Sequence, residues 1–178
     1  MSHNFRRYIA ASCAIGCAAS MTGCSDSGYI GTINGMQIPT GLYIYNLELT
    51  AYNEASSKIK KMLQRLGIPA DRVRRIAIGT YEAEMNVIIH AGGGNVAAEV
   101  FPTMTVITVT DKGPGIPDIN KALQEGWSTA PDYVRQMGFG AGMGLPNMQK
   151  CSDAFDIQSK VGEGTTIVMK FKHQSEDL

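Results

Sequence analysis

The sequence predicts an α/β fold in two layers, with helices covering one face of a mixed, mostly antiparallel sheet. Three observations lead to this prediction. The 178 residues are 44% hydrophobic and 18% charged, which is ordinary for a globular protein and excludes a disordered or collagen-like chain. Segments with strand-like and helix-like periodicity follow one another along the chain. The length suits one domain with an extension and is too short for two domains with substantial cores.

The first half of the domain contains one strand and two helices. Residues 42–50 alternate apolar and polar side chains, as a half-buried strand does. Apolar residues at helical spacing predict a helix over 53–67 and a longer one from 71 to about 90. Before them, residues 26–39 carry Gly, Asn and Pro at short intervals without a sustained period, so we expect a linker or an irregular edge there.

The second half contains two hairpins separated by a long glycine-rich segment. The first hairpin is predicted over 95–111. Residues 112–144 form a loop with one short helical patch, and a loop of that length in a compact domain is usually a lid or a ligand-binding segment. A helix and two more strands follow, over 145–151, 154–160 and 165–172. We therefore divide the chain into a tail or signal-like segment (1–40), the folded domain (41–173) and a short tail (174–178).

The charge balance argues against nucleic acid as a direct partner. Lys and Arg number 16 and Asp and Glu also number 16, so no net positive field attracts a nucleic acid or an anionic membrane. The basic residues of the two helices form either a solvated surface or a contact for an acidic partner patch; they are Lys58, Lys60, Lys61, Arg65, Arg72, Arg74 and Arg75.

Two polar residues on the long helix give the first indication of chemistry. Glu82 and Asn86 are four residues apart, so both side chains project from the same helix face. One is a base and the other an oxygen ligand. Alone, such a pair is more often a solvated helix face, and the motifs that follow are what favour a site.

A carboxylate stands at the end of the predicted strand that closes the first hairpin. Asp111 begins the segment Asp-Lys-Gly-Pro-Gly-Ile, in which Gly113 and Gly115 let the backbone turn and approach a ligand closely. A carboxylate there can accept a hydrogen bond from an exocyclic amino group such as that of adenine. A plain turn after a strand would explain the same residues in isolation.

Alternating glycines lead into the next helix. The segment Gly-Phe-Gly-Ala-Gly-Met-Gly-Leu-Pro, residues 138–146, exposes successive backbone N–H groups at a helix N-terminus, which is favourable for phosphate binding. Residues 162–166, Gly-Glu-Gly-Thr-Thr, lie between the last two strands, where a hairpin turn alone would explain them.

Taken in this order, four motifs resemble the N, G1, G2 and G3 boxes of the gyrase, Hsp90, histidine kinase and MutL ATPase superfamily. They cover residues 82–86, 111–115, 140–145 and 162–165. Within that superfamily the domain looks most like the bacterial anti-sigma-factor and stress-switch serine/threonine kinases. The resemblance extends over about residues 43–172.

The resemblance implies a Bergerat fold, ATP with Mg²⁺, and transfer of the γ-phosphoryl group to a serine or threonine of a partner, often a STAS-type anti-anti-sigma factor, with a sigma factor as a further partner. By motif position Glu82 would be the general base, Asn86 would give an oxygen to magnesium, and Asp111 would hold the adenine amino group. Thr165 or Thr166 would support the Asp111 end of the pocket. The residues expected around the nucleotide are Asn86, Asp111, Gly113, Gly115, Ile116, Gly138, Gly140, Gly142, Met143, Gly144, Leu145 and Thr165.

Two alternatives stay open: a non-catalytic module in which ATP only orders the lid, and a detached catalytic domain of a histidine kinase. A homodimer is also left open. P-loop and eukaryotic-type kinase motifs are absent from the sequence. His90 is expected to cap a helix end. No motif assigns Lys112 or Arg135 to the phosphates, and both are expected to be solvated charges.

The N-terminal segment resembles a bacterial lipoprotein signal with Cys24 as the acylated residue. It is rich in Ala, Gly and Ser rather than Leu, it is too short to span a bilayer, and ATP is a cytoplasmic substrate. We therefore expect a cytoplasmic protein whose first residues are a tag or tail, with membrane contact only if the signal is real.

Overall fold

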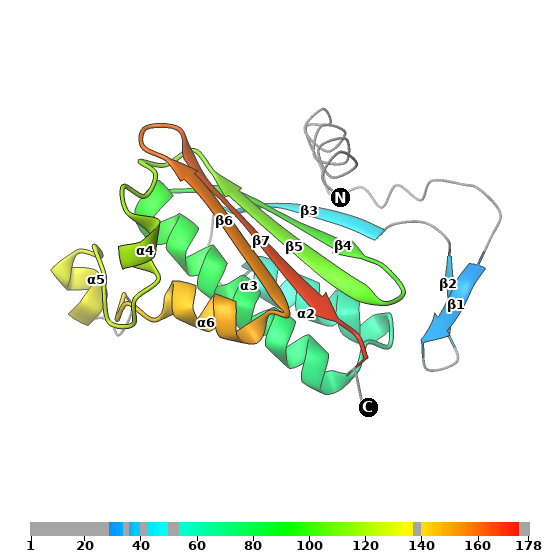
Figure 1. Cartoon of the computed structure of the whole chain (residues 1–178). Helices are drawn as coiled ribbons and strands as arrows, with labels where there is room; N and C mark the ends of the chain where they lie inside the picture. The colour runs from blue at the N-terminus through cyan, green and yellow to red at the C-terminus, as the bar shows by residue number, and fades with distance from the viewer. Residues whose placement is uncertain (1–28, 34–35, 40–42, 50–53, 137–139, 175–178) are drawn as a thin grey trace.

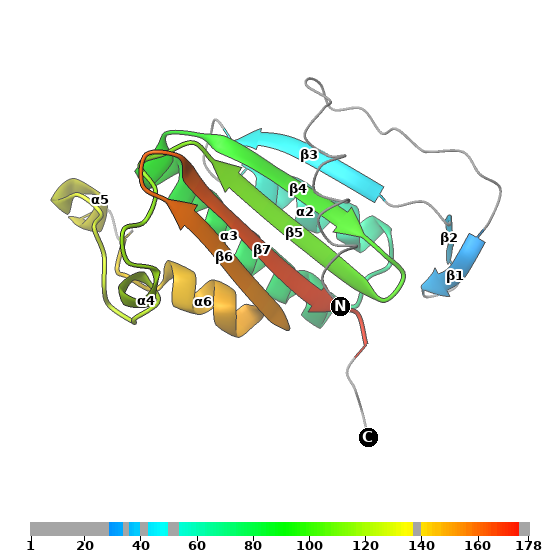
Figure 2. The same ribbon diagram turned by 45° about the horizontal axis from the view of Figure 1, so that its top comes forward.

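The computed structural model describes residues 29–33, 36–39, 43–49, 54–136 and 140–174. A five-stranded antiparallel sheet forms one layer of the domain, and three helices cover one of its faces (Figures 1 and 2). In spatial order the strands are β3 (Tyr43–Leu49), β4 (Gly94–Val100), β5 (Met104–Asp111), β7 (Gly164–Lys172) and β6 (Ala154–Lys160). The helices are α2 (Glu54–Arg65), α3 (Ala70–Ala91) and α6 (Gly144–Cys151), with short α4 (Ile119–Ala122) and α5 (Asp132–Gln136) between β5 and α6. The predicted two-layer α/β architecture is confirmed.

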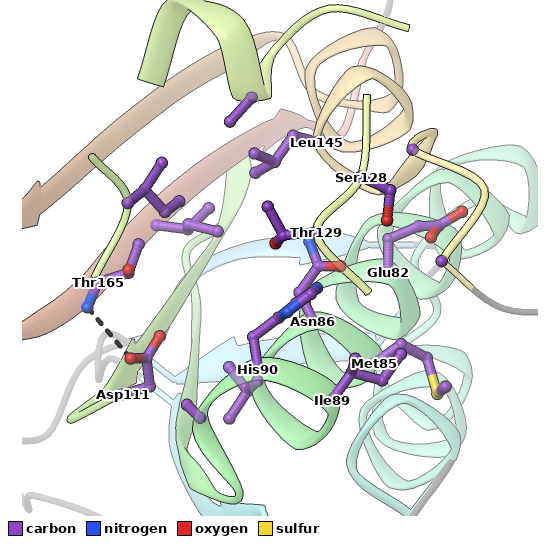
Figure 3. Close-up of a pocket in the computed structure, with 18 of the residues that line it drawn as sticks. Glu82, Met85, Asn86, Ile89, His90, Asp111, Ser128, Thr129, Leu145 and Thr165 are labelled. Carbon is purple, nitrogen blue, oxygen red and sulfur yellow. Dashed lines mark hydrogen bonds between the residues drawn. The ribbon is translucent and has the colours of Figure 1, made fainter. Parts of the chain in front are cut away.

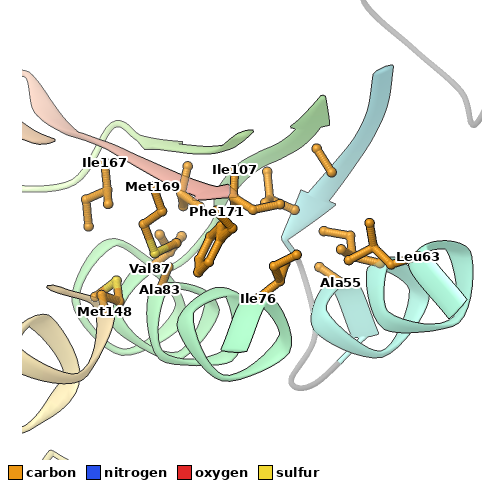
Figure 4. Packing of buried hydrophobic residues seen from close by; sticks show 14 of the residues in the cluster. Ala55, Leu63, Ile76, Ala83, Val87, Ile107, Met148, Ile167, Met169 and Phe171 are labelled. Atoms are coloured by element: carbon orange, nitrogen blue, oxygen red, sulfur yellow. The ribbon is translucent and has the colours of Figure 1, made fainter. Parts of the chain in front are cut away.

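The core lies between the sheet and α2, α3 and α6 (Figure 4). Alternate residues of β4, β5 and β7 point into it, as the period of two requires. The close approach of α3 to β7 depends on Gly79, where a Cβ atom would lie 3.1 Å from the Met169 sulfur and 3.3 Å from the Phe171 ring. The long helix is therefore seated directly on the sheet.

Strand register brings the sequence motifs to one end of the sheet. Gly94, just after α3, is paired with Asp111, the last residue of β5. On the other side of β5, Thr110 is paired with Thr166 near the start of β7. The C-terminal end of α3, the end of β5 and the start of β7 therefore meet at the same end of the sheet.

A glutamate of α3 satisfies the first backbone N–H groups of α2. Glu84 Oε1 accepts hydrogen bonds from the N–H groups of Glu54 (2.9 Å) and Ala55 (3.1 Å), and Oε2 accepts one from Ser56 (3.2 Å). The first N–H groups of a helix have no partner within it, and the positive end of its dipole favours an anion. Glu84 therefore joins the two long helices.

Three differences from the sequence prediction concern the connections and the strand direction. Residues 26–39 were expected to be a linker or an irregular edge, whereas β1 (Tyr29–Ile33) and β2 (Met36–Pro39) pair as an antiparallel hairpin separate from the main sheet. The Asn-Gly dipeptide between these two segments favours a two-residue hairpin turn and is the sequence signal that indicates this hairpin. The loop before α6 contains a second short helix, α5, beyond the one predicted. The five-stranded sheet is antiparallel in every pairing rather than mixed.

Several predictions fall on residues that the structure does not describe. The signal-like segment around Cys24 is among them, and the predicted boundaries of the domain stay predictions. Across the described ranges, no helix combines the length and apolar character needed to cross a membrane.

Candidate functional site

A cavity of about 440 Å³ opens between α3, the end of β5, the start of β7 and the segment before α6 (Figure 3). Its size is that of a small-molecule site. The predicted site residues that line it are Glu82, Asn86, Asp111, Gly115, Ile116, Gly140, Gly142, Met143, Gly144, Leu145 and Thr165. Gly113 is not part of the lining, and Gly138 lies outside the described residues. The four motifs therefore converge on one cavity.

One end of the cavity is built around the carboxylate of Asp111. Its Oδ1 accepts hydrogen bonds from the backbone N–H of Gly113 (2.8 Å) and of Thr165 (3.2 Å), the second drawn in Figure 3. Both of these bonds use Oδ1, and among the described residues none donates a hydrogen bond to Oδ2. Of the two threonines left open by the sequence, Thr165 lines the cavity and Thr166 does not. Gly113, which does not line the cavity, donates its N–H to Asp111.

A serine of β6 fixes the same end from behind. Ser159 Oγ accepts a hydrogen bond from the Ile116 N–H (2.8 Å), donates to the Gly164 carbonyl (3.0 Å), and lies 2.8 Å from Thr165 Oγ1. One hydroxyl thus connects the loop after β5 to the start of β7. Sequence reasoning missed Ser159 because an isolated serine in an alternating strand carries no signal of its own.

The first residue of β7, Gly164, lies against Asp111 and has to be a glycine. Gly164 has a φ of +108°, and a Cβ atom there would lie 2.1 Å from the Asp111 carbonyl oxygen. A side chain would therefore separate the two strands that form this end of the cavity.

The opposite end of the cavity is formed by α3 and α6. Glu82 and Asn86 both line it, as predicted from their shared helix face (Figure 3). A Cβ atom on Gly144 would lie 3.0 Å from Asn86 Oδ1, so the glycine leaves the amide uncovered by a side chain at that position. Glu82 Oε1 accepts a hydrogen bond from Asn147 Nδ2 of α6 at 2.8 Å. Asn147 was not identified from the sequence, since nothing there pairs two residues so far apart in the chain.

The segment before α6 folds back on the loop that follows α4. Gly126 N–H donates to the Gly142 carbonyl at 3.0 Å. Gly142 has a φ of +76°, and a Cβ atom there would lie 2.6 Å from the Trp127 backbone nitrogen. Residues 140–145 of this glycine-rich run line the cavity. Backbone N–H groups at a helix N-terminus are good donors to phosphate oxygens.

Three ionisable residues near the site, His90, Lys112 and Arg135, differ in whether they line the cavity. His90 lines the cavity, whereas the sequence predicted only that it would cap the end of the helix. Desolvation lowers the pKa of its imidazole, and the negative charge of Asp111 partly opposes that shift. Arg135 pairs with Asp132 at 3.4 Å and donates to the Ala130 carbonyl, and neither it nor the exposed Lys112 lines the cavity.

The geometry agrees with comparison to known proteins. Residues 45–171 match the family model of the histidine kinase-like ATPase domain. The serine/threonine-protein kinase RsbT of Bacillus subtilis is 32% identical over 112 residues, 61% of this chain and 78% of that protein. The anti-sigma F factors of Pasteuria penetrans and Bacillus licheniformis are 32% and 31% identical, over 69% and 74% of this chain and 85% and 92% of theirs.

The chain therefore belongs to the histidine kinase-like ATPase family, in the branch of the anti-sigma factors and the serine/threonine kinases related to them. The resemblance stated from the four motifs is confirmed. A solved structure, the mycobacterial sensor histidine kinase MprB, is similar with a TM-score of 0.45 and 15% identity over 71% of this chain and 95% of that one. That likeness is too distant to support a functional argument.

Proposed function

We propose that this chain is an ATP-dependent protein serine/threonine kinase acting in a sigma-factor partner switch. Its substrate would be a serine or threonine of a STAS-type anti-anti-sigma factor, with a sigma factor as its other partner. One observation carries the proposal: Glu82 and Asn86 line the same cavity as Asp111, at its opposite end. The relatives named as an anti-sigma F factor and as a serine/threonine kinase support this assignment.

The nucleotide would lie along the cavity with its base at Asp111. The Oδ2 atom of that carboxylate would accept the adenine amino group, while Thr165 keeps Oδ1 in place. The triphosphate would then reach the N–H groups of the glycine-rich run before α6. ATP is abundant in the cytoplasm, and we place the reaction there.

Asn86 is suited to hold a magnesium ion, because its half-buried side-chain amide lines the cavity and carries an oxygen ligand. Magnesium takes one or two protein oxygens and completes its shell with phosphate oxygens and water. When bound, it neutralises part of the triphosphate charge.

Glu82 would act on the hydroxyl of the substrate. It accepts the hydroxyl proton as the oxygen forms a bond to the γ-phosphorus, while the bond from that phosphorus to the bridging oxygen breaks and ADP leaves. The products are a phosphoserine or phosphothreonine, ADP and the proton. This role requires the partner to bring its hydroxyl within hydrogen-bond distance of Glu82.

The test is to incubate the chain with γ-labelled ATP and a STAS-domain protein. Acid-stable phosphoserine or phosphothreonine supports the proposal. Glu82→Gln should lower transfer about a hundredfold or more and leave nucleotide affinity unchanged. Glu48→Gln, an exposed glutamate on the edge strand β3, is the matched control and should transfer normally.

Two other results would overturn the kinase assignment. Nucleotide-dependent partner binding without transfer would indicate a non-catalytic module in which ATP orders the lid. An acid-labile phosphate on histidine would indicate the catalytic domain of a histidine kinase.

A further inference from the structure

Helix α6 lies antiparallel along α3 and is fixed to it at three levels. At its C-terminal end, Arg75 Nε donates to the Cys151 carbonyl (2.9 Å), and Arg75 Nη2 lies 2.8 Å from Asp153 Oδ1. At its N-terminal end, Gly144 lies against the Asn86 amide. Figure 1 shows α6 beside α3.

The middle level contains the carboxylate that we propose as the general base. Asn147 Nδ2 donates to Glu82 Oε1 at 2.8 Å, and both side chains are half-buried. Asn147 is the fourth residue of α6, so it lies one turn from Cys151 on the same side of the helix. Arg75, Glu82 and Asn86 of α3 thus each meet α6 on one line.

We propose that Asn147 is a positioning residue for Glu82 in phosphoryl transfer, an inference that rests on the proposed function. The amide holds Oε1, and Oε2 is then directed toward the substrate hydroxyl. Glutamate has three side-chain torsions, and a base must be held in one arrangement before the hydroxyl arrives. Asn147 exchanges no proton: the hydroxyl proton moves to Glu82, the new bond forms at the γ-phosphorus, and ADP leaves.

A role in holding α6 in place does not account for this contact. Met148 is fully buried and Leu145 nearly so, and both belong to the main hydrophobic cluster, which already fixes the helix. Arg75 holds the other end. Among these contacts, the hydrogen bond from Asn147 is made to a carboxylate that lines the cavity, that of Glu82.

The test uses Asn147→Leu, which keeps the size of the side chain and removes its donor. We expect kcat for transfer to the STAS-domain protein to fall about 10-fold to 100-fold, with the dissociation constant for ATP within about twofold of the unchanged chain. Gln149→Leu, an exposed amide two residues further along α6, is the matched control and should keep full activity. Unchanged kcat in Asn147→Leu, or an equal loss of ATP affinity, would overturn the positioning role.

The second readout is the same substitution in a Glu82→Ala background. If Asn147 acts through Glu82, adding Asn147→Leu there changes the residual single-turnover rate by less than about twofold. A loss as large as in the normal background would mean that Asn147 supports the fold and would overturn the proposal. Asn147→Ala carries the same expectations and replaces the leucine variant if that one does not fold. Absence of transfer by the unchanged chain refutes the kinase assignment itself, whereas transfer that Asn147→Leu leaves intact refutes only the positioning role.

Discussion

The hydrogen bonds of Glu84 predict that this buried carboxylate is a large contributor to stability and not to chemistry. The side chain is 1% exposed and accepts three backbone N–H groups at the start of α2. Replacing it with alanine removes the acceptor of the Ala55 N–H group, and Ala55 is 2% exposed. Glu54 is exposed, so water can replace the carboxylate there.

The magnitude follows from these contacts. The buried N–H group of Ala55, left without this acceptor, costs about 1–3 kcal/mol. Loss of the negative charge at the helix N-terminus adds about 0.5–1 kcal/mol. We therefore expect Glu84→Ala to lower the free energy of unfolding by about 3 kcal/mol. Glu84→Gln keeps one acceptor oxygen for two of the three bonds and should cost about half as much.

The assay is urea unfolding followed by circular dichroism, with the denaturant slope checked for constancy. Because a domain of this size is stable by about 5–15 kcal/mol, both variants should remain measurable, and nucleotide affinity should persist in conditions where they are folded. Glu82→Gln is the matched control on the same helix, and it should lose transfer while unfolding nearly as the unchanged chain does. A cost below about 1 kcal/mol for Glu84→Ala would refute this account of the cap.

Three further predictions concern other residues. Gly164→Ala should lower the free energy of unfolding by at least about 3 kcal/mol, because its Cβ atom would collide with the Asp111 carbonyl oxygen of β5. Gly162→Ala, in the turn just before β7, has open space around its Cβ atom and should cost only about 1 kcal/mol for its positive φ. Equal urea midpoints for the two variants would contradict this. Burial lowers the pKa of His173 from its ordinary 6.5, so the unfolded chain binds more protons below pH 6.5 and stability should fall there as the pH drops, by up to about 1.4 kcal/mol per pH unit. His173→Gln should flatten that decline in urea titrations at pH 7.5 and 5.5, and an identical decline would exclude the histidine as its cause. Asp111→Asn should weaken ATP binding in calorimetry about tenfold or more, while Asp156→Asn on the exposed face of β6 should not; equal affinities would refute the adenine contact.

Much of the site could be predicted because its signals are local. The pair Glu82 and Asn86 shares a helix face by spacing alone, and both line the cavity. Asp111 ends an apolar strand and is followed by glycines, a context that suits close approach of a ligand. Helices and strands with strong periodicity were likewise predicted to within a few residues of their observed ends.

The contacts that fix these residues could not be predicted, because they join segments that only the tertiary fold brings together. Asn147 meets Glu82 across 65 residues of sequence, and Ser159 meets Ile116 across 43. Neither asparagine in a short helix nor serine in a strand signals such a partner. The hairpin of β1 and β2 was missed for a different reason, since the absence of a period outweighed an Asn-Gly dipeptide that favours such turns.

The two glutamates of α3 show where sequence reasoning stops. Glu82 and Glu84 are two residues apart, which is about 200° around a helix, so they must face nearly opposite ways. Glu82 shares its face with Asn86, and that alone separates it from Glu84 as the candidate base. Periodicity could not show that Glu84 would be buried and bonded to backbone N–H groups of another helix. A charged residue facing the core of a helix pair therefore points to a neighbouring helix end as readily as to an active site, and only the fold distinguishes the two.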